Sequence, residues 1–387
     1  MNLKTKAISP SEFPIALFSV GLPLLSAAYS MNGSIAPQNL ADILVAGLAI
    51  LGLLVESCKK EKSTSSRLWL TAGIPSILIF WICSKYITPM LSPLAPSLPF
   101  LMEIRPFLYG FVAALWVTNF SMPKPVNFYF WASCLSSLII AEFIYLFCLN
   151  GVVTTPELLG NAKLNAPILL AGLCATLHEP SKLKITRALI FTGIMCTLSR
   201  DAGFAAILVL SLFGPGKALK KLAFASVFFI FNFLVLVSQD MTFFNPNDLP
   251  TYWLWFSILG LFEKNPHLLL FGYHISSPLP LNIPAAIWQL WHKQNFLWTD
   301  SGTYLFHIAP LWLHILTTWG IAGIAGAAAI LTTLSIKYSS SIMASLITAV
   351  IITGFFDPIF YNPASGIILI MFFICAAQSE TRSFLFE

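Results

Sequence analysis

The tripeptide Ser199-Arg200-Asp201 is the sharpest local signal for chemistry in this sequence. Its Arg200-Asp201 pair separates two runs of twelve uncharged residues, 188–199 and 202–213, each about half of the roughly 20 apolar residues that cross a bilayer. An ionisable side chain held at such a depth costs several kcal/mol unless it faces a polar cavity. A planar, permanently charged guanidinium in a cavity is suited to bidentate binding of a phosphate or diphosphate. The alternative for Arg200 is a structural ion pair with Glu142 or Asp357.

Two histidines near the end of a long polar segment are candidates for acid-base chemistry. Pro310 lies between His307 and His314 and is expected to begin a helix, which leaves His307 in the preceding turn. Imidazole titrates near neutral pH, so either histidine could act as a general base for a hydroxyl nucleophile. Asp300 could orient one of them or bind a substrate hydroxyl. A satisfied structural histidine is the alternative for each.

The remaining candidates for substrate binding are Arg105, Asp201, Lys264, Lys293 and His274. Arg105 opens a predicted span and could face the same cavity as Arg200, or it could anchor the span by snorkelling to the interface. For Lys264 and Lys293, which lie in the long polar segment, a solvated charge is the alternative to a substrate contact. No cluster of histidine, cysteine or carboxylate residues has metal-ligand spacing. We therefore expect chemistry without a metal or other cofactor.

The elements that position these residues are expected to be transmembrane helices. Of the 387 residues, 57% are hydrophobic and only 10% are charged, whereas about a quarter of residues in soluble domains are charged. The composition excludes an ordinary soluble protein and predicts one all-α membrane domain over residues 1–387. About twelve apolar runs are predicted as spans, near 13–30, 40–56, 68–84, 105–120, 126–148, 164–178, 188–199, 202–213, 222–238, 320–336, 340–356 and 364–378.

The distribution of positive charge gives the chain an orientation. With the N-terminus inside, the inner connections collect 15 of the 21 lysines and arginines, as is typical of cytoplasmic loops. This predicts a bacterial inner-membrane protein with both termini in the cytoplasm and the segment 239–303, between spans nine and ten, in the periplasm. The same rule predicts a hairpin at 188–213, because a single long helix would put Lys184 and Lys217 on opposite sides.

The segment 239–303 is far longer than an ordinary helix connection. Its tryptophans, set among Pro, Asn and His residues, predict a folded cap on the membrane rather than a solvated tether. They are Trp253, Trp255, Trp288, Trp291 and Trp298. Their rings could pack against flat apolar faces of a substrate, and anchoring in the interfacial belt is the alternative.

Four short motifs, taken in their order along the chain, resemble those of the O-antigen polymerase and O-antigen ligase superfamily of bacterial inner-membrane glycosyltransferases. The hairpin tip Thr197-Leu198-Ser199-Arg200 resembles its Ser-Arg motif, and Lys264-Asn265-Pro266 followed by Leu270-Phe271-Gly272 resembles its loop signature. The stretch from His307 through Gly320 and Gly323 is similar to its element of a histidine, a short helix and Gly-x-x-Gly. Asp357-Pro358 and Asn362-Pro363 resemble its closing pattern.

The resemblance implies transfer of a glycan from an undecaprenyl diphosphate donor to an acceptor hydroxyl on the periplasmic face. It implies that Arg200, with Arg105, holds the departing diphosphate, and that His307 or His314 assists the attack of the acceptor oxygen. The implied partners are an undecaprenyl-diphosphate-linked oligosaccharide, membrane lipid and a chain-length regulator protein, with no role for nucleic acid.

Three functions remain open at this point, and small differences separate them. Ligases of this superfamily carry a His-Asn pair, whereas Ile308 follows His307 and Ile315 follows His314 in this chain. The difference favours an O-antigen polymerase, which joins one lipid-linked repeat to another, over a ligase that delivers glycan to lipid A core. A transporter or flippase of lipid-linked saccharide is the further alternative, since twelve spans with buried ions are also ordinary for that class.

Overall fold

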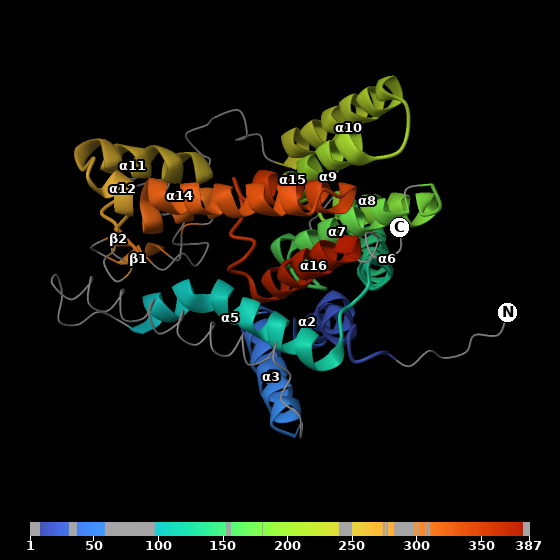
Figure 1. The fold of residues 1–387 in the computed structure, drawn as a ribbon. Helices are drawn as coiled ribbons and strands as arrows, with labels where there is room; N and C mark the ends of the chain where they lie inside the picture. The colour runs from blue at the N-terminus through green and yellow to red at the C-terminus, as the bar shows by residue number, and fades with distance from the viewer. Residues whose placement is uncertain are drawn as a thin grey trace.

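The computed structural model describes residues 8–30, 37–58, 97–151, 156–179, 181–239, 250–273, 275, 278–281, 298–299, 302–305, 308 and 310–381. Within these ranges the chain is built almost entirely from helices, with a two-residue antiparallel ladder between β1 and β2 (Figure 1). The prediction of an all-α fold is confirmed for this part of the chain.

The helices follow the predicted apolar runs closely. In chain order they are α1 Phe13–Ala16, the π-helical η1 Leu17–Gly21, α2 Leu22–Ser30, α3 Pro37–Cys58, α5 Ser97–Phe120, α6 Pro125–Asn150, α7 Ala162–Ala175, η2 Thr176–His178, α8 Lys184–Cys196, α9 Arg200–Phe213, α10 Ala218–Gln239, α11 Pro250–Lys264, α12 Leu268–Phe271, α14 Leu311–Lys337, α15 Ser341–Thr353 and α16 Pro363–Thr381. The strands are β1 Trp298–Thr299 and β2 Gly302–Thr303. The predicted span 68–84 lies outside the described residues.

Among the described residues, three helices are long and apolar enough to cross a membrane, which marks the chain as a membrane protein. They are α3 over Asn39–Cys58, α6 over Pro125–Asn150 and α14 over Leu311–Lys337. Helices α8 and α9 have 13 and 14 residues, so each reaches about 20 Å, short of the roughly 30 Å hydrocarbon core. Figure 1 also shows α3 at a steep angle to α5 and α14. The number of twelve spans therefore stays a prediction.

The main hydrophobic core surrounds α7, whose described side chains are buried from Leu164 to its end. Glycines allow the neighbouring helices to approach closely. A Cβ at Gly172 of α7 would collide with Ala132 of α6, and a Cβ at Gly193 of α8 would collide with Ser136 of α6. Helix α6 therefore lies tightly against α7 and α8, and α9, α15 and α16 complete the layer around α7.

A second, smaller core lies within and beside the segment predicted as a cap. Leu254 and Ile258 of α11 form one buried cluster with Leu305, Ile308 and Leu313, the last from the start of α14. Figure 1 shows α11, α12, β1 and β2 gathered at one side of the molecule. The described part of the segment is folded, as predicted, and its location at a membrane surface stays a prediction.

Candidate functional site

The predicted hairpin tip is a break between two helices. Helix α8 ends at Cys196 and α9 begins at Arg200, and Leu198 between them has a left-handed φ of +55°. The Ser199 hydroxyl donates to the Asp201 carboxylate at 2.6 Å. Asp201 is buried, whereas Arg200 is exposed, and a carboxylate in the first turn suits the positive end of the helix dipole. The Asp201 carboxylate is thus engaged by its neighbour Ser199 in the tip, and Arg200 next to it is exposed.

A buried cluster of Glu103, His314 and Tyr361 brings together three distant parts of the chain. His314 Nε2 lies 2.8 Å from Glu103 Oε2, and the Tyr361 hydroxyl donates to the same oxygen at 3.2 Å. The rings of His314 and Tyr361 are in contact, with centroids 4.3 Å apart. Glu103 and His314 are 2% and 1% exposed, whereas Tyr361 is partly exposed. The cluster is thus a buried pair of Glu103 and His314, and the Tyr361 phenol that contacts both is the member with partial exposure to the surface.

The local sequence explains how each member of this cluster is placed. Helix α5 begins at residue 97 rather than 105, which puts Glu103 on the helix. Pro310 caps α14 as predicted, and the His314 N–H closes the first turn on the Pro310 carbonyl at 2.8 Å. Tyr361 lies in the turn between α15 and α16, where its N–H donates to the Pro358 carbonyl at 2.8 Å. Glu103 and Tyr361 were not predicted as site residues, whereas His314 was.

The start of α14 is tied to the end of α15, and this holds His314 beside the turn that carries Tyr361. The Trp312 backbone N–H donates to the Gly354 carbonyl at 3.1 Å. Its indole Nε1 donates to the Ile351 carbonyl at 2.8 Å. The first turn of α14 therefore lies against the end of α15, close to the turn that carries Tyr361.

Arg105 is on the same helix as Glu103 but on a different face. Residues two apart on an α-helix point about 200° apart, so Glu103 and Arg105 cannot share one pocket. The Arg105 guanidinium instead donates to Asp42 of α3 at 2.7 Å, and the Tyr109 hydroxyl donates to the same carboxylate at 3.3 Å. The Arg105 and Asp42 side chains are 27% and 32% exposed. The structure therefore shows a partly solvated ion pair at the position predicted to bind substrate.

Two glycines named in the motifs lie against each other where α12 meets α14. Gly320 interrupts α14 with φ +65° and ψ −160°, and a Cβ there would fall on the backbone of Leu270. Gly272 has φ +82°, and a Cβ added there would collide with the backbone of Thr317 and Thr318. The Tyr273 N–H donates to the Thr317 carbonyl at 2.6 Å. The contact connects the predicted cap directly to the helix that carries His314.

Other charged residues of interest have mainly structural surroundings. Glu142 accepts hydrogen bonds from the backbone N–H groups of Leu158 and Leu159, at 2.7 and 3.3 Å. The Arg187 guanidinium, which the sequence placed on a cytoplasmic connection, is buried and donates to the hydroxyl and carbonyl of Thr176 at 3.1 and 3.0 Å. Lys264 ends α11 and is exposed. The predicted site residues Asp300, His307, Lys293 and His274 lie outside the described residues.

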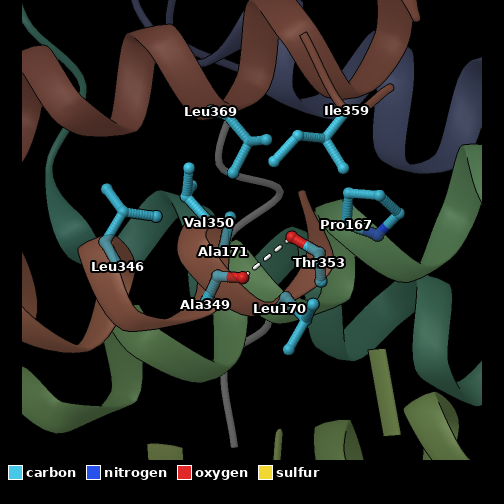
Figure 2. Close-up of a pocket in the computed structure, with 9 residues that line it drawn as sticks. All are labelled: Pro167, Leu170, Ala171, Leu346, Ala349, Val350, Thr353, Ile359 and Leu369. Atoms are coloured by element: carbon cyan, nitrogen blue, oxygen red, sulfur yellow. Dashed lines mark hydrogen bonds between the residues drawn. The ribbon is translucent and has the colours of Figure 1, made fainter. Parts of the chain in front are cut away.

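A small cavity between α7, α15 and α16 is too small to be a substrate site. It has a volume of about 10 Å³, enough for at most one water molecule. Its lining is apolar apart from Thr353, whose hydroxyl donates to the Ala349 carbonyl at 2.8 Å (Figure 2). In the described part of the chain no group of three or more histidine, cysteine or carboxylate side chains is arranged to hold a metal ion.

Comparison with known proteins adds no relative. No protein-family model matches the chain, and no curated protein matches it. Three features of the described structure bear on function: the hairpin tip at Arg200, the Glu103-His314-Tyr361 cluster and the contact between Gly272 and Gly320.

Proposed function

We propose that this protein is a metal-independent membrane glycosyltransferase of the O-antigen polymerase type. It takes a glycan from an undecaprenyl diphosphate donor and transfers it to a lipid-linked repeat unit on the periplasmic face of a bacterial inner membrane. The observation that carries the proposal is the contact of Gly272 with the backbone beside Gly320. Gly272 and Gly320 belong to two different motifs that resemble the superfamily, and these motifs pack against each other. Gly320 follows His314 by six residues.

The proposed reaction has a place for each part of this arrangement. Arg200 lies exposed at a helix break and offers a planar fork to a diphosphate. His314, held by Glu103, assists loss of the proton from the acceptor hydroxyl. As the new glycosidic C–O bond forms, the bond from the sugar to the diphosphate breaks and the diphosphate leaves with the electron pair. Positioning and cationic charge can supply much of the rate, because diphosphate is a good leaving group.

The proposed membrane arrangement keeps twelve spans, cytoplasmic termini and a periplasmic cap over 239–303. Membrane lipid surrounds the helices, the lipid-linked oligosaccharide is the substrate, and a chain-length regulator is a partner. Alkaline phosphatase fused near Asn282 is expected to be active, because the cap would then reach the periplasm. An inactive fusion at this position would contradict the orientation.

Arginine replacements test the diphosphate site. Arg200→Lys keeps the charge but loses the planar fork, so it should impair repeat transfer nearly as much as Arg200→Ala. Arg105→Lys is the matched control, because its partner Asp42 can pair with either cation and the pair is partly exposed. Both variants must insert at wild-type level. Normal transfer by Arg200→Lys would contradict bidentate recognition.

The products in a deletion strain separate polymerase from ligase. Loss of a polymerase should leave lipopolysaccharide capped with a single repeat, because a separate ligase still transfers what it receives. Loss of a ligase should leave bare core and let polymer accumulate on undecaprenyl diphosphate. The second outcome would replace the polymerase assignment and leave the chemistry unchanged.

A transporter of lipid-linked saccharide is the second candidate, and one structural feature favours it. Helix α14 is interrupted at Gly320, and interrupted helices beside buried ionisable groups are frequent in transporters. Glu103 and His314 are such a buried pair. Movement of the lipid-linked repeat across vesicles containing only this protein, with no change in the length of the glycan, would favour this candidate.

A further inference from the structure

The two oxygens of the Glu103 carboxylate have different surroundings. Oε2 receives hydrogen bonds from both the His314 ring and the Tyr361 hydroxyl. Oε1 is fully buried, and no group in the described structure donates to it. An oxygen of a carboxylate is costly to bury without a donor, because nothing replaces the water it has lost. The unpartnered oxygen therefore identifies a position suited to a hydrogen-bond donor from a ligand.

The second feature of this carboxylate is that Oε2 is already engaged by its neighbours. Burial and the neighbouring carboxylate both raise the pKa of Tyr361, so its hydroxyl stays protonated and donates. The second hydrogen bond of Oε2 is with the His314 ring. A ligand hydroxyl can therefore donate to Oε1 without displacing either of these hydrogen bonds.

We propose that Glu103 is the catalytic base, and that its Oε1 binds and deprotonates the acceptor hydroxyl. His314 and Tyr361 are positioning residues that hold the carboxylate through Oε2. In the transfer step the hydroxyl proton moves to Oε1 while the acceptor oxygen forms its bond to the sugar carbon. The bond between that carbon and the diphosphate breaks, and the diphosphate keeps the electron pair. This role rests on the proposed transfer reaction and changes the assignment of the base from His314 to Glu103.

The surroundings of His314 support this division of roles. Its Nε2 is engaged by Glu103 at 2.8 Å, and Tyr361 lies against its ring. His314 is also 1% exposed, whereas Tyr361 is partly exposed and lies next to the carboxylate. Because Nε2 is already engaged by the carboxylate, His314 is suited to hold Glu103 rather than to take the acceptor proton.

The test uses the full-length protein in detergent with the host's undecaprenyl-diphosphate-linked repeat as donor and acceptor. Glu103→Gln should lower kcat by about 10²- to 10⁴-fold with little change in KM, because the amide accepts no proton. Glu103→Ala should regain part of its activity with sodium formate, which supplies a carboxylate in the vacated volume. His314→Ala should not respond to formate.

The Tyr361→Phe variant keeps Glu103 and gives a second, independent readout. The phenol is one of the two groups that hold the carboxylate in place, so without it kcat should fall while KM changes little. A Glu103→Gln enzyme with most of its activity, or an unchanged kcat in Tyr361→Phe, would overturn the role of Glu103 and leave the proposed function standing. Absence of transfer by the wild-type protein would overturn both.

Discussion

A methyl group added at Gly320 is expected to destabilise the protein strongly. The backbone there has φ +65° and ψ −160°, a region used almost only by glycine, and another residue in it costs about 1–3 kcal/mol. The new Cβ would also collide with the backbone of Leu270, which cannot rotate away. Overpacking of this kind costs about 1–3 kcal/mol. Gly320→Ala should therefore lower the free energy of unfolding by about 2–6 kcal/mol.

Gly326→Ala is the matched control on the same helix. Gly326 lies in the regular part of α14, and a Cβ there meets nothing within 4 Å. Because alanine is the better helix former, this change should leave stability unchanged or raise it by roughly 0.5–1 kcal/mol. Thermal unfolding in one detergent at one scan rate compares the variants, since unfolding of membrane proteins is often irreversible. Equal unfolding temperatures for the two variants would refute the account of the kink.

A double-mutant cycle sharpens this prediction. Gly272→Ala should be as damaging as Gly320→Ala, because each Cβ collides with the backbone beside the other glycine. Once either substitution has separated α12 from α14, the other adds only its backbone strain. The double variant should therefore lose less stability than the sum of the two single variants. Strict additivity would show that the two glycines do not share one contact.

Three further changes test other parts of the structure. Arg187→Met should lower the free energy of unfolding by about 1–3 kcal/mol, because it leaves the buried Thr176 carbonyl without this donor, and exposed Lys184→Met should have little effect. Glu142→Gln should loosen the 156–160 segment, because its carboxamide has one acceptor oxygen and can serve only one of the Leu158 and Leu159 N–H groups, so amide hydrogen exchange in this segment should accelerate. Purified enzyme should keep its activity in a chelator, and inhibition that magnesium or manganese reverses would contradict the metal-independent assignment.

Some features could be predicted from the sequence because local rules determine them. The break at residues 197–199 follows from charge, since a continuous helix would separate Lys184 from Lys217 across the membrane. The start of α14 follows from Pro310, which cannot continue a preceding helix and favours a first turn. The predicted start of the tenth span at residue 320 coincides with the kink, because the apolar run and the exposed half of α14 both begin there.

The partner of His314 could not be predicted in the same way. Glu103 lies 211 residues away, and no local pattern connects the two positions. A partial signal was present, because a carboxylate inside an apolar run needs a partner in a membrane protein. The sequence predicts a span that begins at residue 105, which leaves Glu103 outside the membrane helix and without the need for a buried partner. The helix instead begins at Ser97 and includes Glu103. The sequence does not predict the pairing of Arg105 with Asp42 either, because this pairing depends on how α3 packs against α5.

The most direct measurement of the central claim is glycan length on the lipid carrier. The purified protein is placed in liposomes with one undecaprenyl-diphosphate-linked repeat, and the products are resolved by mass spectrometry. We expect carriers with two or more repeats, and release of one undecaprenyl diphosphate for each bond formed. Unchanged single repeats, with or without their movement across the bilayer, would contradict the assignment of this protein as a polymerase.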